Sequence, residues 1–392
     1  MKTKGSPRGA LFLWLRLCYA RERIVNNGVH PMPTGVLPIQ TLREVLRKGF
    51  IKGVSEKFLN PASLDIPCSQ EAYRLERNFL PRKGQTVRSK LAAAGATPFD
   101  LKNPLEVGVS YLIRAQGNYR LPHNIYAYAN PKSSTGRIFV LVRVIADKVA
   151  MYDALITKER GGWAGEIWLL VKPEAFPVLV TEGEALAQIR LFDGKSFLDE
   201  RDLNLLMEDP GLFFNPRGKK LTRDDVDYHS GSFLLTVGLP RGVAGWECTR
   251  VNKILELSKR KHYRAQDFFS PVRVHSGRLD LRRGSFYILT THEHLRLPPS
   301  CAAELRAIDP RFGEFRSHSA GFFDPGWGLE ARGQPITLEI TPHEDMTIEH
   351  GQTIARVRYE NMKDVPSVLY GSAKSNYKGQ IRGPKLSKHF RS

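Results

Sequence analysis

A short turn in the first half of the chain has the chemistry of a phosphate site, Lys132-Ser133-Ser134-Thr135-Gly136-Arg137. Two adjacent hydroxyl groups, a flexible glycine, backbone N–H groups and flanking cations form a concavity that suits phosphate oxygens. Turns of this composition are also common as solvated hairpins. The pattern alone therefore leaves both interpretations open.

A single carboxylate interrupts an apolar strand pattern in the second half, Ile336-Thr337-Leu338-Glu339-Ile340. The aligned residue of the first half is Leu170. On strand alternation Glu339 falls on the opposite face from Leu338, which fits a solvent-facing glutamate. A carboxyl group half-buried in a sheet has instead the surroundings that raise its pKa toward the range of a general acid-base group. Both interpretations of Glu339 stay open.

Other common catalytic motifs are missing from the sequence. The segment nearest to a zinc deaminase motif is His292-Glu293-His294 followed by Pro298-Pro299-Ser300-Cys301, which lacks a second cysteine and has the wrong order of His and Glu. No P-loop or dinucleotide-binding glycine motif opens a helix, and no G-x-S-x-G elbow supports a catalytic triad. The sequence thus predicts chemistry without zinc.

Composition and charge narrow the class of protein. A chain of 392 residues with 41% hydrophobic and 25% charged residues suits two soluble domains, and no apolar run is long enough for a membrane span. Four scattered cysteines argue against a disulfide scaffold and fit a reducing cytoplasm. The net charge of +19 favours polyanionic ligands, although the aromatic motif of an RNA-binding domain is absent, so we expect no nucleic-acid partner.

The sequence contains an internal repeat of one β-rich unit, with one copy in each half of the chain. Each copy has an aromatic strand start that leads into Arg-Leu-Pro and closes on Gly-x-x-x-Ala-x-x-Arg: Gly108, Tyr111, Arg120-Leu121-Pro122, Gly183, Ala187 and Arg190 in the first, and Gly284, Tyr287, Arg296-Leu297-Pro298, Gly351, Ala355 and Arg358 in the second. Between these anchors the phosphate-type turn and the carboxylate strand each occur in only one copy. Duplication with complementary loss predicts a site that the copies share.

The remaining pattern predicts a mainly β fold with a few short helices. Short runs such as 110–113, 138–144, 167–171 and 233–237, broken by Gly, Pro and Asn, are typical of strands in a sandwich or jelly-roll barrel. Apolar spacing predicts helices over 40–49 and around 250–257. The expected divisions are a basic, disordered extension, a first domain, a linker, a second domain and a tail, at 1–36, 37–195, 196–225, 226–368 and 369–392.

Four motifs in this order give the chain a resemblance to a known family. They are Pro61-Ala62-Ser63-Leu64-Asp65, the turn 132–137, Ala320-Gly321-Phe322-Phe323-Asp324-Pro325-Gly326-Trp327, and Ile336-Thr337-Leu338-Glu339. The series resembles the dCTP deaminases of the trimeric dUTPase superfamily, in a tandem form of that fold. The resemblance implies two dUTPase-like β-barrel domains, a zinc-independent attack of water on cytosine C4, and magnesium that accompanies the triphosphate.

The resemblance also implies roles for individual residues. Glu339 stands at the position of the general base, and Ser133 and Arg137 stand at those of the catalytic serine and arginine. The substrate-binding positions implied by the family are Lys132, Ser134, Ala320, Asp324, Tyr370, Lys374, Lys378 and Gln380. The last four belong to a C-terminal tail that resembles the segment folding over the nucleotide.

Neither copy alone has the full set of family residues. The second copy offers Ala307 in place of Ser133 and Arg311 in place of Arg137, and the first offers Leu170 in place of Glu339. Split motifs indicate one composite site, either within a chain or between chains. We expect a cytoplasmic homo-oligomer, built on pseudo-threefold packing of the repeats, that converts dCTP to dUTP and ammonia and supplies dUTP for thymidylate synthesis.

Other functions stay open at this stage. Asp324 suits a dUTP diphosphatase or a bifunctional enzyme, in which it would orient water. A non-catalytic nucleotide-binding regulator would keep the turn 132–137 and have no need of Glu339.

Overall fold

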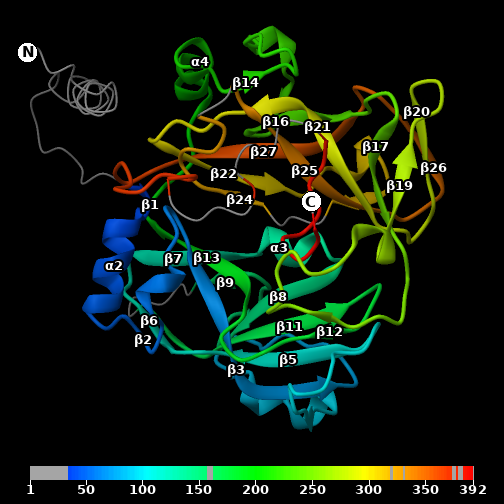
Figure 1. Cartoon of the computed structure of the whole chain (residues 1–392). Helices are drawn as coiled ribbons and strands as arrows, with labels where there is room; N and C mark the ends of the chain where they lie inside the picture. The colour runs from blue at the N-terminus through cyan, green and yellow to red at the C-terminus, as the bar shows by residue number, and fades with distance from the viewer. Residues whose placement is uncertain are drawn as a thin grey trace, which may run out of the picture. The chain divides into compact units, whose positions relative to one another are not determined.

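The computed structural model describes residues 34–156, 162–317, 321–329, 332–372, 377 and 383–391. Contacts group Thr34–Ser392 into one compact unit, and residues 1–33 lie outside the described residues. The expected extension 1–36 reaches too far, because Gly35–Val36 form a strand that pairs with Asp193 and Phe192. The fold is mainly β, as predicted (Figure 1).

The first domain is built on a sheet in the order β8-β11-β5-β3-β13-β7-β9, with β1 on β13 and β4 on β3. β2, β6 and β10 form a small separate sheet. The strands are β1 Gly35–Val36, β2 Ile51–Lys52, β3 Leu64–Leu75, β4 Thr97–Pro98, β5 Ser110–Ala115, β6 Asn118–Leu121, β7 Ile125–Pro131, β8 Val140–Ala146, β9 Ala154–Leu155, β10 Trp163–Gly165, β11 Ile167–Pro173, β12 Val178–Leu179 and β13 Ala185–Asp193.

The second domain has a matching sheet in the order β19-β17-β21-β16-β27-β22-β24, with β14 and β25 on β21, β15 on β16 and β23 on β25. Its strands are β14 Phe213–Phe214, β15 Tyr228–His229, β16 Ser232–Gly238, β17 Val243–Cys248, β18 Leu255–Glu256, β19 Phe269–Arg273, β20 Arg278–Leu281, β21 Tyr287–Leu295, β22 Cys301–Arg306, β23 Phe315–Ser317, β24 Phe322–Phe323, β25 Gln334–Pro342, β26 Met346–Glu349 and β27 Thr353–Asn361. The predicted strands at 110–113, 167–171 and 233–237 are confirmed as β5, β11 and β16.

The repeat seen in the sequence is a structural repeat. The Tyr111 hydroxyl accepts a hydrogen bond from the backbone N–H of Glu106 at 3.1 Å, and the Tyr287 hydroxyl accepts one from Arg282 at 2.9 Å. Tyr111 pairs with Val171 and Tyr287 pairs with Ile340, so the preceding residues of β11 and β25 are equivalent. This register confirms the alignment of Leu170 with Glu339.

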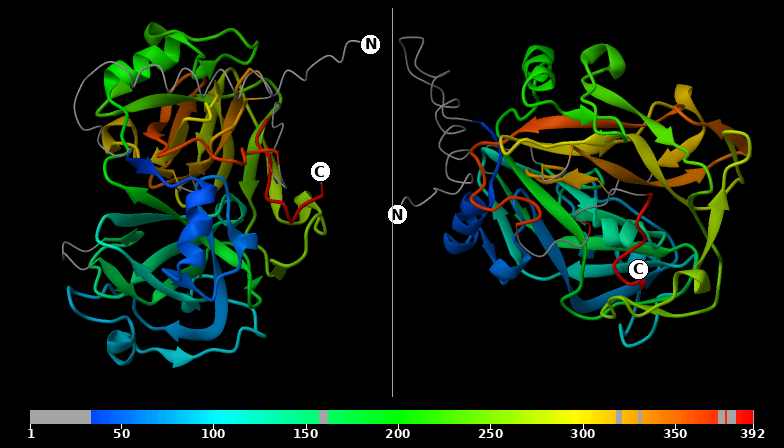
Figure 2. Two further views of the ribbon diagram at one scale, coloured as in Figure 1. Left: turned by 90° about the vertical axis from the view of Figure 1, so that its left-hand side faces the viewer. Right: turned by 45° about the horizontal axis from the view of Figure 1, so that its top comes forward.

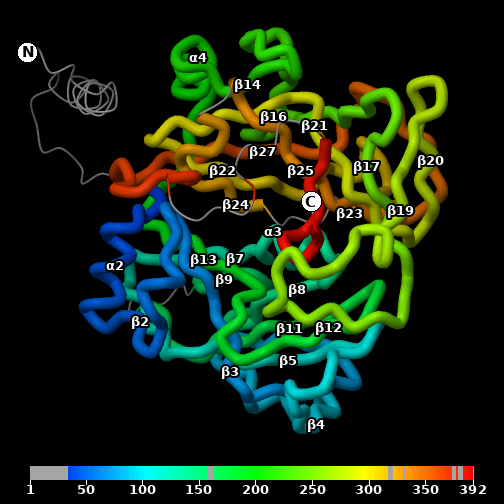
Figure 3. The backbone as a smooth tube through the Cα atoms, in the orientation of Figure 1, coloured from blue at the N-terminus to red at the C-terminus, as the bar shows by residue number. Residues whose placement is uncertain are grey.

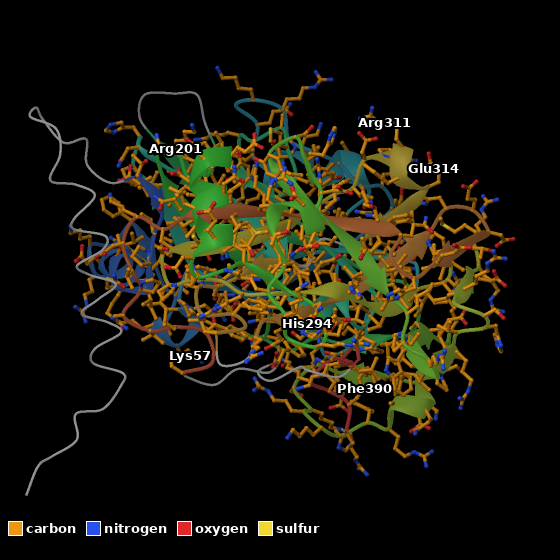
Figure 4. All side chains as sticks on the ribbon, turned by 90° about the horizontal axis from the view of Figure 1, so that it is seen from above. Lys57, Arg201, His294, Arg311, Glu314 and Phe390 are labelled. Carbon is orange, nitrogen blue, oxygen red and sulfur yellow. The ribbon has the colours of Figure 1, made fainter. Side chains whose placement is uncertain are left out.

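The alignment of the turn needs a correction. Arg190 pairs with Tyr128 and its repeat partner Arg358 pairs with Glu304, so residues at equal distances after Tyr128 and Glu304 are equivalent. This register aligns Ala307 with Pro131, and the helical turns that follow begin at the N-caps Lys132 and Asp309, so Ala307 is not the counterpart of Ser133. Arg311, expected to match Arg137, is an exposed side chain that pairs with Asp309 at 2.6 Å and lies at the surface in Figure 4.

Of the two helices predicted from the sequence, the structure confirms the first and contradicts the second. The helix expected over 40–49 is α2, Ile39–Arg47, whose buried Ile39 and Leu42 face the interior. No helix forms around 250–257, because β18 pairs in parallel with β12 and buries Leu255 in the first-domain core. Tertiary pairing thus overrides the local apolar spacing.

The interval expected as a linker is structured. It contains α4, Glu200–Glu208, whose N-cap Asp199 accepts a hydrogen bond from the Asp202 amide at 2.9 Å. The helix buries Leu203 and Met207 in the second-domain core. This helix could have been predicted from the sequence, because Asp199 is a favourable N-cap residue and the apolar residues Leu203 and Met207 lie four positions apart. No helix among the described residues is long and apolar enough to cross a bilayer.

The two domains share a hydrophobic core. Residues of the second half complete the first-domain core, and they include Leu255, Leu257, Phe268, Phe269, Phe286 and Ile288. Phe139 of the first half stacks on Phe286, with ring centroids 4.3 Å apart and planes 9° apart. The yellow-green segment can be followed along the first domain in Figure 3. The chain's end lies beside the loop at 259–263 in both views of Figure 2, where Lys261 donates a backbone hydrogen bond to Lys388.

Replacing Phe286 with alanine tests how far the domains stabilise each other. We expect Phe286→Ala to lower the free energy of unfolding by about 3–5 kcal/mol, the usual effect of removing a buried aromatic ring. We expect the native protein to unfold in a single calorimetric transition, and because the ring joins the domains, this transition should separate into two in the variant.

Phe213→Ala is the matched control for this experiment. Phe213 is buried within the second-domain core against Phe233 at 4.9 Å. This variant should lose a similar free energy without separating the transition. An unchanged single transition in Phe286→Ala would contradict coupling through this contact.

Candidate active site

Residues from both domains line one cavity of about 450 Å³ within a single chain. The first domain contributes the turn 132–137, and the second contributes β25 and the segment before it. The lining includes Asp65, Lys132, Ser133, Ser134, Arg137, Asp324, Trp327, Thr337, Glu339, Tyr370 and Tyr377. The split motifs that the sequence could place either within or between chains thus meet within one chain.

The turn folds into a short helix, α3, Ser133–Gly136. Lys132 has an extended backbone at the N-cap, and its carbonyl accepts from the amides of Thr135 at 2.8 Å and Gly136 at 3.0 Å. Ser134 and Thr135 are buried. The solvated-hairpin interpretation is therefore wrong. The backbone N–H groups of Thr135 and Gly136 bind the Lys132 carbonyl inside the turn, so they do not face a ligand as expected.

Glu339 is buried in β25, with only 3% of its surface exposed. The solvent-facing interpretation of this glutamate is wrong. A Cβ atom placed on Gly136 would lie 2.6 Å from the Glu339 carboxyl carbon, so the turn of the first domain touches the carboxyl group directly. Glu339 also borders a second cavity of about 340 Å³, which Gly136 and Leu170 line as well.

The electrostatic surroundings of Glu339 favour its neutral form. Burial raises its pKa well above the usual value, while the nearby Arg137 guanidinium acts in the opposite direction. Its Oε2 atom has no hydrogen-bond partner among the residues that the structure describes. A buried carboxyl oxygen without a partner is ready to bind an incoming molecule.

Arg137 is held from the side of the C-terminal tail. Its Nη1 atom donates to the Lys385 carbonyl at 2.8 Å, and its guanidinium lies 3.8 Å from the centre of the Tyr377 ring. The Ser387 hydroxyl donates to the Ser134 carbonyl at 2.7 Å. The tail therefore fixes the orientation of the turn and of its arginine.

Lys132 is paired with Asp65, the last residue of the Pro61–Asp65 motif. Asp65 also accepts a hydrogen bond from Asn60 at 3.0 Å. No role for this motif could be predicted from the sequence. The contact shows that it orients the lysine at the edge of the cavity.

The turn that follows β24 also lines the cavity, through Asp324 and Trp327. Gly326 adopts a left-handed φ of 98°, and the Trp327 ring packs on Tyr370 at 4.9 Å. Burial raises the pKa of Asp324 to about 6, although the Arg190 guanidinium opposes the shift. Asp324 can therefore change its charge near neutral pH.

The structure does not bring every predicted residue into view. Ala320, Lys374, Lys378 and Gln380 lie outside the described residues. Two contacts were missed: the sequence marked Arg190 only as a repeat residue and Tyr377 only as part of the tail. Neither the burial of Arg190 nor the packing of Tyr377 on Arg137 has a local sequence signal, because both depend on contacts across domains.

Comparisons with known proteins agree with this arrangement. The N-terminal domain of the 2'-deoxycytidine 5'-triphosphate deaminases matches residues 33–195, and the C-terminal domain matches residues 217–390. The crystal structure of 2'-deoxycytidine 5'-triphosphate deaminase from Agrobacterium tumefaciens is 31% identical with a TM-score of 0.76, covering 86% of this chain and 100% of that one.

Two curated relatives are each described as a dUMP-forming dCTP deaminase. The protein of Methanothermobacter thermautotrophicus is 30% identical over 123 residues, which are 30% of this chain and 60% of that protein. The protein of Methanosphaera stadtmanae is 33% identical over 111 residues, 27% of this chain and 53% of that protein. The chain thus spans a little over half the length of these two relatives. Together with the two domain matches and the solved structure, this shows that the chain belongs to the 2'-deoxycytidine 5'-triphosphate deaminase family, in a form with two tandem domains.

Proposed function

We propose that the chain deaminates dCTP to dUTP and ammonia. The observation that carries this proposal is the buried Glu339 carboxyl group, which meets the turn 132–137 in one cavity. A cavity of about 450 Å³ is within the range that binds small ligands. Membership of the deaminase family supports the choice of substrate.

Glu339 has the surroundings that proton transfer requires. A carboxyl group with a raised pKa can give its proton to N3 of the cytosine and then, as a carboxylate, take one from water. The hydroxide so formed attacks C4. Glu339 passes the water proton to the amino group, which leaves as ammonia. The carboxylate then takes the proton of the C4 hydroxyl group, so that the C4 carbonyl of uracil forms and the neutral carboxyl group is restored.

Ser133 and Arg137 are proposed to assist this step from the first domain. The Ser133 hydroxyl would orient the attacking water. Arg137 is held by Lys385 and Tyr377, so its positive charge is preorganised to stabilise the negative charge that develops at C4.

The phosphates are proposed to bind at the edge of the cavity nearest the tail. Lys132 is paired with Asp65, and a triphosphate would compete for its ammonium group. Ser134, Asp324 and Tyr370 complete the proposed contacts, together with Ala320, Lys374, Lys378 and Gln380.

Hydrolysis of the product to dUMP is a second candidate activity. Both curated relatives are described as dUMP-forming, and Asp324 lines the cavity as a carboxylate able to orient water. The proposed primary product remains dUTP for thymidylate synthesis, and separation of the products decides between the two. Residues of one chain supply the lining of the cavity. The homo-oligomer and the cytoplasmic location remain predictions.

Incubation with dCTP and magnesium, followed by separation of dUTP, dUMP and ammonia, tests the proposal directly. Glu339→Gln should lower turnover by about 10² or more, because the amide cannot exchange the proton. Glu293→Gln is the matched control, since Glu293 is also a buried glutamate but binds Thr236 outside the cavity. Normal turnover in Glu339→Gln would refute its role, and nucleotide binding without any turnover in the native protein would point to a regulator.

The stability of Glu339→Gln should depend on pH. Burial raises the pKa of Glu339 in the folded protein above that in the unfolded chain, so this group destabilises the fold increasingly as pH rises above the unfolded pKa. The variant should therefore unfold at a higher temperature than the native protein at pH 8, and the difference should vanish toward pH 4. Equal unfolding temperatures across this range would show that burial does not raise the pKa of Glu339 in the folded protein.

Magnesium is proposed to accompany the triphosphate, where it supplies charge neutralisation for the phosphates. The described part of the chain holds no cluster of three or more His, Cys, Asp or Glu side chains placed for a metal ion. The cation and hydroxyl groups of Lys132 and Ser134 suit phosphate oxygens. We propose that the chemistry proceeds without zinc.

Metal dependence can be measured with two chelators. Activity should survive a zinc-selective chelator, fall when magnesium is removed and return when it is added. Stoichiometric zinc in the active protein, with activity lost on its removal, would contradict this expectation.

A further inference from the structure

Arg190 of β13 is a fully buried arginine that reaches from the first domain into the second. Its Nη1 atom donates to Glu360 at 2.7 Å and to the Ala303 carbonyl at 3.0 Å. Its Nη2 atom donates to the Phe323 carbonyl at 3.1 Å and to Asp324 Oδ1 at 3.3 Å. All four acceptors belong to the second domain.

The two ends of the guanidinium have different surroundings. Nη1 binds Glu360 and Ala303, which lie on β27 and β22 and do not line the cavity. Nη2 binds two consecutive residues, Phe323 and Asp324, which do line it. A planar fork with fixed donors holds two such acceptors in one relative orientation.

We propose that Arg190 is a positioning residue of the nucleotide site, which acts through Asp324. The guanidinium ties Asp324 to the rigid sheet of the second domain and keeps its carboxylate directed into the cavity. This inference rests on the proposed function, because it assigns Asp324 to nucleotide binding. It means that the first domain shapes the wall that the second domain contributes.

The repeat supplies an internal comparison. Arg358 occupies the equivalent place in the second copy, where it stacks on Phe197 at 3.6 Å and binds Glu304 at 3.4 Å. None of these three residues lines the cavity. Both arginines join neighbouring elements, but only Arg190 holds a residue of the site.

The charge of Asp324 gives the inference a second readout. The charged groups that act on Asp324 are Arg190 and Lys132, which lower its pKa, and Asp65, which raises it together with burial. Loss of Arg190 removes the nearest cation, so Asp324 should hold its proton to a higher pH. The acidic limb of the rate profile should then move upward in pH.

The experiment compares Arg190→Met, Arg358→Met, Asp324→Asn and the double variant Arg190→Met/Asp324→Asn. Arg190→Met should reduce kcat/KM for dCTP by about tenfold or more, mainly through KM, and shift the acidic limb to higher pH. Arg358→Met should lose thermal stability while kcat/KM stays within about twofold of the native value. The double variant should be no less active than Asp324→Asn alone.

Two outcomes would overturn the inference. Equal losses of activity in Arg190→Met and Arg358→Met would make Arg190 a structural residue, and so would independent losses in the double variant. If Arg190→Met does not fold, Arg190→Lys keeps the charge but not the fork, and it should show the same rise in KM.

Failure of the proposed function has a separate signature. In that case the native protein releases no ammonia from dCTP. Calorimetric binding of dCTP to the same variants then still decides the inference, because Arg190→Met should weaken binding and Arg358→Met should not.

Discussion

The stacked rings of Phe139 and Phe286 are the contact on which the arrangement of the site depends. Phe139 follows the turn 132–137 closely and adopts a left-handed φ of 54°, which costs about 1–3 kcal/mol in a residue with a side chain. Phe286 precedes β21, whose Ile288 pairs with Glu339. The stacking therefore fixes the turn of one domain against the carboxylate strand of the other, and the burial of two aromatic rings offsets the strained backbone.

Burial has opposite effects on the charged groups of the site. Arg190 is fully buried, and its two Nη atoms donate to four acceptors, including two carboxylates, which offsets much of the cost of desolvation, although its Nε atom has no partner in the described part of the chain. Glu339 is almost as deeply buried, and one of its oxygens has no partner in the described part of the chain. The fold thus pairs the charge of Arg190 with carboxylates, whereas the Glu339 oxygen proposed to react keeps an open hydrogen-bonding position. Stability and reactivity are divided between residues of different domains.

The sequence alone predicted much of this structure, since patterns that depend on neighbours along the chain were informative. The repeat, the strands and α2 follow from local periodicity, and Glu339 was recognised because it breaks an apolar run. The helix expected at 250–257 was wrong because β18 pairs with a strand far away in sequence. The alignment of Ser133 with Ala307 was wrong because strand register decides it. The contacts of Arg190 and Tyr377 cross domains, so no local pattern could reveal them.

The shared core has a consequence for how the protein is made. The first domain lacks Leu255, Phe268, Phe269 and Phe286 from its core until the second half has left the ribosome. At roughly 5–20 residues per second, the segment from Phe192 to Ile288 takes about 5–20 seconds to synthesise. During this interval the first half holds apolar surface that its own residues cannot cover. The nascent chain therefore folds late, and its first half is the part that needs protection from aggregation during translation.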